Sequence, residues 1–267
     1  MLSPDLAAAR RLTGRAYTDV AGEPAGATQV ERLVERYRWV AGYCDDRIVI
    51  EVACGTGQGL GLLRSRAKHV YGCDIDRENL QIVRMTYGHG MSLVQTDAHL
   101  LPFRDSSADV VILLETIYFL SSPDAFVREA RRVLRPGGHC LISAINKDCP
   151  DFNPKHPLYL GHYGARDLAQ LLQRHGLAAE CFGIIPMNKP TLRQRAFLPI
   201  KQVAIRLNLI PETMQARMFL KRIVFGPLQQ MPRDITPLAG TAVPPRRLSP
   251  GEPDKVHQVV MCAGQRT

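Results

Sequence analysis

The sequence predicts an α/β domain with a doubly wound, mostly parallel sheet and a largely helical insertion before its last strand. Short apolar segments alternate with segments of helical periodicity up to residue 186. The segment Ala-Asp-Val-Val-Ile-Leu-Leu at 108–114 is so continuously apolar that both faces of the strand must be covered. Such an alternation of buried strands with helices indicates a parallel sheet between two helical layers.

Local signals place the individual elements. Helical spacing of apolar residues predicts helices at 28–43, 58–67, 77–87, 123–134 and 166–175. Ser122 and Pro123 supply a cap and a first-turn residue for the fourth of these helices, and Gly176 ends the fifth. Apolar runs predict strands at 47–53, 70–74, 91–95, 108–114, 139–145, 177–185 and 256–262.

We expect four segments along the chain. Residues 1–27 form an N-terminal segment or lid, and 28–186 form the α/β core. Residues 187–255 form a basic, helical and Pro-rich insertion, and 256–267 return to the core as its last strand. The insertion holds 12 Lys and Arg against 4 Asp and Glu, so it carries nearly all of the chain's net charge of +9.

The composition excludes several classes of protein. No apolar run approaches the roughly 20 residues that a membrane-spanning helix needs. The seven cysteines are scattered and never form a Cys-x-x-Cys pair, so neither a zinc site nor a redox motif is visible and no metal is expected. We therefore expect reduced thiols and a cytoplasmic protein without a signal peptide.

The segment Ile-Glu-Val-Ala-Cys-Gly-Thr-Gly-Gln-Gly at 50–59 is the strongest chemical signal. Two glycines, Gly55 and Gly57, follow a strand and precede a helix, where the backbone can approach a ligand closely. A nicotinamide-binding fingerprint requires a glycine where this chain has Leu60. Glu51 instead stands at the strand end, where a carboxylate can neutralise a cation on the ligand.

Acidic residues also end the next two strands. Asp74 lies 19 residues after Gly55, the spacing at which a carboxylate accepts hydrogen bonds from ribose hydroxyls. Asp97 follows the third strand and can accept a proton from an adenine amino group. Three carboxylates and a Gly-rich turn at one sheet edge indicate a nucleoside that carries a cation and no phosphate.

The sequence here resembles the class I S-adenosylmethionine-dependent methyltransferases. The matching segments are EVACGTGQG, VYGCDID, TDAHLLPF, ADVVILLETIYFL and REARRVLRPGGHCLIS. The resemblance implies a seven-stranded sheet with an antiparallel last strand, S-adenosyl-L-methionine as cofactor and S-adenosyl-L-homocysteine as product, with 28–186 as the cofactor-binding core. It implies cofactor contacts at Glu51, Ala53, Gly55, Thr56, Gly57, Asp74, Ile75, Asp97, Ala98 and Leu114.

The catalytic residues are less defined. Many relatives have an acidic residue and a His after the fourth strand, where this chain has Tyr118 and Phe119, so a base role for that His does not transfer. Glu115, Tyr118 and His162 are the candidates for a general base. Tyr17 is a candidate to cover the sulfonium, since an aromatic face stabilises a cation by about 0.5–2 kcal/mol.

The insertion at 187–255 is the part of the chain that we expect to contact the methyl acceptor. We interpret it as a lid over a small molecule, a sugar, natural product or other metabolite, methylated on O or N. Two alternatives remain open: its basic charge holds nucleic acid, which its few aromatic residues disfavour, or it docks on an anionic membrane, a lipid-linked substrate or a protein partner. The sequence leaves open whether the protein is a monomer or a homodimer.

Overall fold

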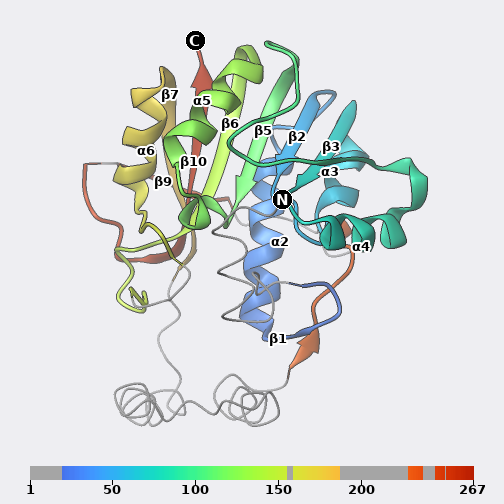
Figure 1. The fold of residues 1–267 in the computed structure, drawn as a ribbon. Coiled ribbons are helices and arrows are strands. Elements are labelled where there is room, and N and C mark those ends of the chain that lie inside the picture. Colours follow the sequence, from blue (N-terminus) through green and yellow to red (C-terminus); the bar gives the residue numbers. More distant parts are fainter. Residues whose placement is uncertain (1–19, 155–158, 187–227, 237–243, 250) are drawn as a thin grey trace.

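The computed structural model describes residues 20–154, 159–186, 228–236, 244–249 and 251–267. Within these residues the main sheet has eight strands. They are β2 (Ile48–Val52), β3 (His69–Asp74), β4 (Ser92–Gln95), β5 (Ala108–Leu114), β6 (Leu134–Ile145), β7 (Leu177–Pro186), β9 (Arg246–Leu248) and β10 (His257–Arg266). Their order across the sheet is β4-β3-β2-β5-β6-β10-β7-β9 (Figure 1).

The pairing confirms a mostly parallel sheet with an antiparallel last strand. Strands β4, β3, β2, β5 and β6 pair in parallel, and β10 lies between β6 and β7, antiparallel to both. The expected count of seven strands is one too low for the part of the chain that the structure describes. The eighth, β9, comes from the Pro-rich segment and pairs with residues 181–183 of β7. Three residues are too few for an alternating pattern, so its signal is absent from the sequence.

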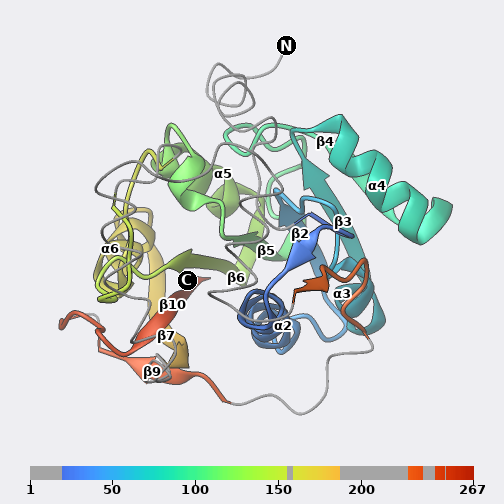
Figure 2. The same ribbon diagram turned by 90° about the horizontal axis from the view of Figure 1, so that it is seen from below.

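Helices cover both faces of the sheet (Figure 2). The first layer holds α2 (Ala27–Ala41), α3 (Leu60–Arg66) and α4 (Arg77–Tyr87), and the second holds α5 (Pro123–Val133) and α6 (Ala165–Arg174). Val110 and Ile112 of β5 pack into the first layer, whereas Val111 and Leu113 pack into the second. This alternation explains why the strand is apolar throughout. Among the described residues no helix is long and apolar enough to cross a membrane.

Several boundaries differ from the prediction. Strand β6 begins at Leu134, directly after α5, rather than at residue 139, and its register with β5 shifts between Ala108 and Val110. Strand β10 continues to Arg266 rather than to residue 262. Its outer half pairs on both sides, with β6 and β7, so pairing extends the strand beyond its apolar run. Two 3₁₀ turns, η1 (Gly88–Gly90) and η2 (Ile117–Phe119), complete the core.

The described parts of the insertion return to the core. Strand β8 (Gln229–Gln230) pairs with β1 (Pro24–Ala25), and the neighbouring Met231 and Ile235 are buried. The backbone N–H of Ile235 donates to the carbonyl of Gln58 at 3.0 Å, next to the Gly-rich turn. The two basic stretches at 192–209 and 211–225 lie outside the described residues, so the fourfold division of the chain stays a prediction.

The cysteines correct one expectation. We expected seven reduced thiols, but Cys181 of β7 and Cys262 of β10 form a disulfide. The two residues are direct partners in the antiparallel register, with their Cα atoms 4.2 Å apart. They are separated by 81 residues, so only the insertion of β10 beside β7 brings them together. The other five cysteines are free and buried.

Candidate functional site

The site begins with the sharp turn after β2. Ala53, Gly55 and Gly57 have φ of 55°, 56° and 77°, the left-handed region that glycine adopts at little steric cost. A β-carbon built on Gly57 would lie 2.6 Å from Val83 Cγ2 of α4, so the turn packs too closely for a side chain there. A β-carbon on Gly55 would meet no heavy atom of the described residues within 4 Å. The turn is therefore closed on its α4 side and open at Gly55.

The Thr56 side chain forms its hydrogen bonds within the protein. Its hydroxyl accepts a hydrogen bond from the Ala21 backbone N–H at 3.1 Å and donates to Gln58 Oε1 at 3.0 Å. The residue is almost fully buried. The Thr56 side chain thus ties the start of the described chain to the turn, a role that its sequence position does not reveal.

Glu51 of β2 is a buried carboxyl group beside this turn. Its Oε1 accepts a hydrogen bond from the Tyr37 hydroxyl of α2 at 2.5 Å. Its Oε2 is buried and has no hydrogen-bond partner among the described residues. Burial raises the pKa of Glu51 to about 8, although the Tyr37 hydrogen bond acts in the opposite direction. One oxygen of this carboxyl group is therefore held by the protein and the other is left for a donor or a cation.

Asp74, at the end of β3, is hydrogen-bonded to the same turn. Its Oδ2 accepts from the Gly55 N–H at 2.8 Å, and its Oδ1 accepts from the Asp76 N–H at 2.8 Å and from Asn79 Nδ2 at 3.4 Å. Burial raises the pKa of Asp74 to about 6, while the two backbone hydrogen bonds oppose this rise. A carboxylate offers about four lone-pair sites, so Asp74 retains room for a further donor.

Asp97 follows β4 and is the most accessible of the three carboxylates. Its side chain is 41% exposed, and its Oδ1 accepts from both the backbone N–H of His99 at 2.9 Å and its ring Nδ1 at 2.6 Å. The neighbouring Ala98 is buried and Ile75 is half-buried. The Thr96 N–H donates to the Asp74 carbonyl at 3.0 Å, which joins the ends of β3 and β4.

The sheet thus brings the predicted carboxylates to one edge. Glu51, Asp74 and Asp97 come from three adjacent parallel strands, and the charge of Asp74 contributes to the raised pKa of Glu51. No group of three or more His, Cys, Asp or Glu among the described residues could hold a metal ion.

Glu115 lies beyond Leu114 at the end of β5 and has a positive φ of 50°. Its carboxylate accepts from the hydroxyls of Tyr118 at 3.0 Å and Ser143 at 3.2 Å, and lies 3.7 Å from Arg36 Nη1 of α2. These contacts hold the Glu115 side chain in place. Burial raises the pKa of Tyr118 well above its ordinary value, so its hydroxyl stays protonated and does not act as a base.

His162 belongs to an aromatic cluster that reaches Tyr118. Its ring centroid lies 5.2 Å from Phe152 and 6.3 Å from Tyr159, and Tyr159 lies 4.5 Å from Tyr118. The Leu160 N–H donates to the Tyr118 carbonyl at 2.8 Å, which fixes the two segments together. The structure thus brings Tyr118 and His162 into one cluster, while the other proposed aromatic residue, Tyr17, lies outside the described residues.

Three residues of this region were not identified from the sequence. Tyr37 and Arg36 lie on α2, where Tyr37 fits the apolar spacing of a core helix and Arg36 reads as a surface charge. Both are buried and contact Glu51 and Glu115, respectively. His99 follows Asp97 by two residues, a spacing that could have suggested the hydrogen bond it makes.

The chain is similar to known methyltransferases in sequence and in fold. Residues 50–142 match a family described as a methyltransferase domain. A probable S-adenosylmethionine-dependent methyltransferase of Mycolicibacterium smegmatis is 33% identical over 147 residues, 54% of this chain and 57% of that protein. A fatty-acid O-methyltransferase of the same species is 36% identical over 98 residues, 36% of each chain.

A solved structure agrees with the fold. An S-adenosylmethionine-dependent methyltransferase of Thermotoga maritima, described as a possible histamine N-methyltransferase, superposes with a TM-score of 0.57 over 89% of this chain and 92% of that one, at 14% identity. The chain spans about half the length of the curated relatives it matches. Residues 50–142 are thus a methyltransferase domain, and the relatives in sequence and in fold are described as S-adenosylmethionine-dependent methyltransferases.

Proposed function

We propose that this protein transfers a methyl group from S-adenosyl-L-methionine to a small acceptor molecule. The observation that carries the proposal is the buried Oε2 of Glu51, which has no partner within the described residues and lies beside an open glycine turn. A buried polar atom without a partner is costly in a folded protein, so its retention favours a ligand group that pairs with it. The ammonium group of the cofactor's methionine portion can donate a hydrogen bond to this oxygen.

The other cofactor groups fit the same edge. Asp74 would accept hydrogen bonds from the ribose hydroxyls, and its own hydrogen bond to Gly55 orients it toward the turn. Asp97 and Ala98 would lie at the adenine edge, with Ile75 against the ring and the Leu114 backbone beneath the methionine portion. Bound there, S-adenosyl-L-methionine supplies a methyl group on a positively charged sulfur.

The protein's own part in such a reaction is mainly alignment. Holding two reactants in line can lower a barrier by roughly 7–11 kcal/mol, and a base adds about 10²–10⁴-fold only where the acceptor must lose a proton. Glu115 is held by three neighbours and is suited to position Tyr118 and Arg36. His162 is exposed at the cluster rim and remains the better placed of the three candidates to take up a proton.

For the acceptor we propose a small molecule with a substantial apolar part, such as a lipid, a fatty acid or a natural product, methylated on O or N. The aromatic cluster of Tyr118, Phe119, Phe152, Tyr159 and His162 stands next to the end of β5 and supports this choice. The fatty-acid O-methyltransferase among the relatives supports it as well. We further propose that residues 187–255 cover the acceptor and that the protein acts in the cytoplasm.

Calorimetric titration with S-adenosyl-L-homocysteine tests the cofactor assignment. We expect binding by the wild type, a loss of at least tenfold in Asp74→Ala, and unchanged affinity in Asp45→Asn, which removes an exposed carboxylate paired with Arg66. Equal affinity of wild type and Asp74→Ala would refute the assignment. A screen of fatty acids and aromatic metabolites with a labelled methyl donor then tests the acceptor class, and transfer only to nucleic acid would contradict it.

A further inference from the structure

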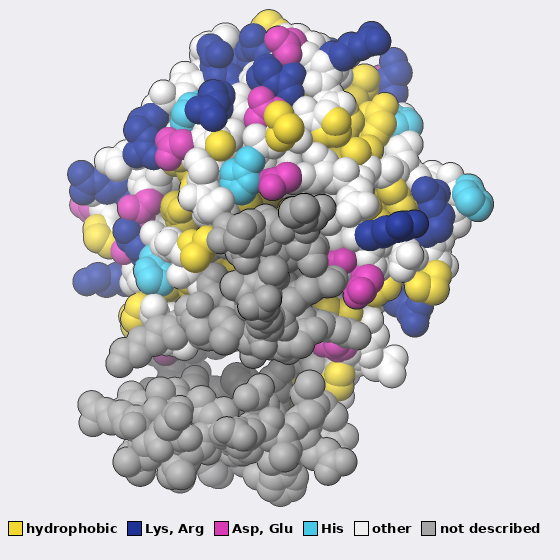
Figure 3. Space-filling model, in the orientation of Figure 1, with side chains coloured by type: hydrophobic (Ala, Val, Ile, Leu, Met, Phe, Trp, Pro, Cys, Tyr) yellow, Lys and Arg dark blue, Asp and Glu magenta, His cyan; other side chains and the backbone are white. Residues whose placement is uncertain are grey.

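A cavity lies at the end of the sheet where strand β5 begins, away from the proposed cofactor site at the other end of the parallel strands. It has a volume of about 600 Å³ and lies between the loop before β5, the C-terminal ends of α5 and α6, and the end of β10. Five arginines line it, namely Arg128, Arg131, Arg132, Arg174 and Arg266. Lys and Arg side chains gather over this upper end of the molecule in Figure 3.

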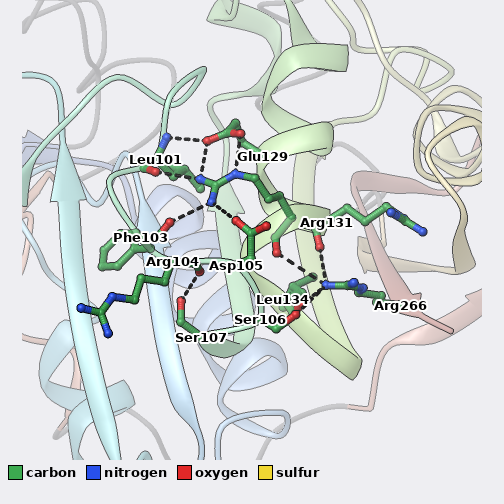
Figure 4. A network of polar contacts seen from close by, with 11 residues as sticks. Leu101, Phe103, Arg104, Asp105, Ser106, Ser107, Glu129, Arg131, Leu134 and Arg266 are labelled. Carbon is green, nitrogen blue, oxygen red and sulfur yellow. Dashed lines mark hydrogen bonds and ion pairs between the residues drawn. The ribbon is translucent and has the colours of Figure 1, made fainter.

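Arg132 maintains the structure of this region. Its Nε and Nη2 bond both carboxylate oxygens of Glu129, and its remaining donors bond Asp105 and the carbonyls of Leu101 and Phe103 (Figure 4). These contacts use all five N–H donors of a guanidinium group. Arg132 therefore has no donor left for a ligand.

Arg266 satisfies the end of α5. Its Nη1 donates to the carbonyls of Arg131 and Leu134 and to Ser106 Oγ at 3.2 Å. The carbonyls at a helix C-terminus are the groups that attract cations there. Arg266 already donates hydrogen bonds to these carbonyls. The C-terminal end of α5 therefore does not need the two further arginines on its last turns as donors.

Arg128 and Arg131 are those two arginines. Both are exposed, and within the described part of the chain no hydrogen bond or ion pair engages either guanidinium. Figure 4 shows the Arg131 guanidinium apart from the dashed contacts that involve Glu129 and Asp105. A β-carbon built on Gly176, which follows α6, would lie 3.4 Å from Arg131 Nε, so Arg131 reaches across from α5 to α6.

The charge around the cavity is unbalanced. Three acidic residues lie near the five arginines: Asp105 and Glu129 with Arg132, and Asp124 with Arg174 and His175. Five arginines against three acidic residues leave an excess of two positive charges. Among the described residues Arg128, Arg131 and Arg266 form no ion pair, and of these three guanidinium groups only that of Arg266 donates hydrogen bonds. Guanidinium groups bind phosphate through paired N–H donors. Two guanidinium groups without an acidic partner can each pair with one phosphate of a ligand that carries two.

We propose that this cavity binds the phosphate groups of a small phosphorylated molecule, with Arg128 and Arg131 as its main ligands and Arg174 at the rim. The volume of about 600 Å³ is within the range of about 300–1,000 Å³ for small-molecule sites. A membrane surface is flat and does not enter such a cavity, so we favour a soluble ligand. The site stands on this cavity alone and is independent of the proposed methyl transfer.

Titration of the full chain with inorganic pyrophosphate, at an ionic strength of about 0.15 M, tests the proposal. We expect the wild type to bind pyrophosphate more tightly than inorganic phosphate. Arg128→Ala and Arg131→Ala should each weaken this binding about tenfold, because each removes charge-assisted hydrogen bonds. Arg104→Ala is the matched control, since Arg104 is an exposed arginine of the neighbouring loop that does not line the cavity (Figure 4).

The outcomes separate a defined site from general attraction of anions. Unchanged thermal unfolding and unchanged binding of S-adenosyl-L-homocysteine in the two variants show that weaker pyrophosphate binding is local. Failure of the wild type to bind pyrophosphate, or equal weakening by Arg104→Ala, overturns the proposal. If the wild type binds short duplex DNA more tightly than pyrophosphate, and the same two variants lose this binding, the proposal is also overturned and the surface is assigned to nucleic acid.

Discussion

The buried carboxyl group of Glu51 should make the stability of the cofactor-free protein depend on pH. Burial raises its pKa from an ordinary value of 4.5 to about 8. Between these values the folded protein keeps the proton and the unfolded chain has lost it. The folded state then binds more protons, so the free energy of unfolding falls as pH rises through this window.

The size of the effect follows from the width of the window. Each unit of pKa difference corresponds to about 1.36 kcal/mol, so three pH units, from 5 to 8, correspond to roughly 4 kcal/mol. The variant Glu51→Gln keeps an oxygen that can accept from Tyr37 and has no charge to gain. Its amide nitrogen places a hydrogen-bond donor near the position of Oε2. Any change in stability that this donor causes does not vary with pH.

Urea unfolding of wild type and Glu51→Gln at pH 5, 6, 7 and 8, without cofactor, measures the contribution of Glu51 to the pH dependence of stability. We expect the stability of the wild type relative to the variant to fall steadily with pH, by up to about 4 kcal/mol in total. Because other titrating groups are shared, the difference between the two proteins isolates Glu51. A difference that is constant from pH 5 to pH 8 would show that Glu51 is ionised in the folded protein and would refute the reasoning.

Three further predictions concern the same contacts and the core. Tyr37→Phe removes the hydrogen bond that lowers the pKa of Glu51, so the pH at which stability is lost should move upward in the same unfolding series. Phe126→Ala empties a fully buried position between α5 and the sheet and should lower the free energy of unfolding by about 3–5 kcal/mol in urea, whereas a loss below about 1 kcal/mol would contradict the packing. Alkylation of the unfolded chain without reductant, followed by mass spectrometry, should label five cysteines, and seven after reduction; seven labels without reductant would show that Cys181 and Cys262 are unpaired.

Local patterns were sufficient for the core of the fold. The apolar run at 108–114 predicted a strand with both faces covered, and Val110 and Val111 do pack into opposite helical layers. The same patterns missed β9, because a three-residue edge strand is held only by its partner β7. They also missed the Cys181–Cys262 bond, because strand order across 81 residues has no local signature.

The candidate site shows the same division. Glu51, Asp74 and Asp97 were predicted because each stands at or just after the end of a strand that the sequence marks clearly, and parallel strands end at one edge. Tyr37 was assigned only to the core, since its spacing on α2 is that of a buried stripe. It is buried, and it also donates a hydrogen bond to Glu51. A tyrosine rather than a phenylalanine on such a stripe carries a hydroxyl that needs a partner when buried, and the nearest buried acidic strand end is where that partner should be sought.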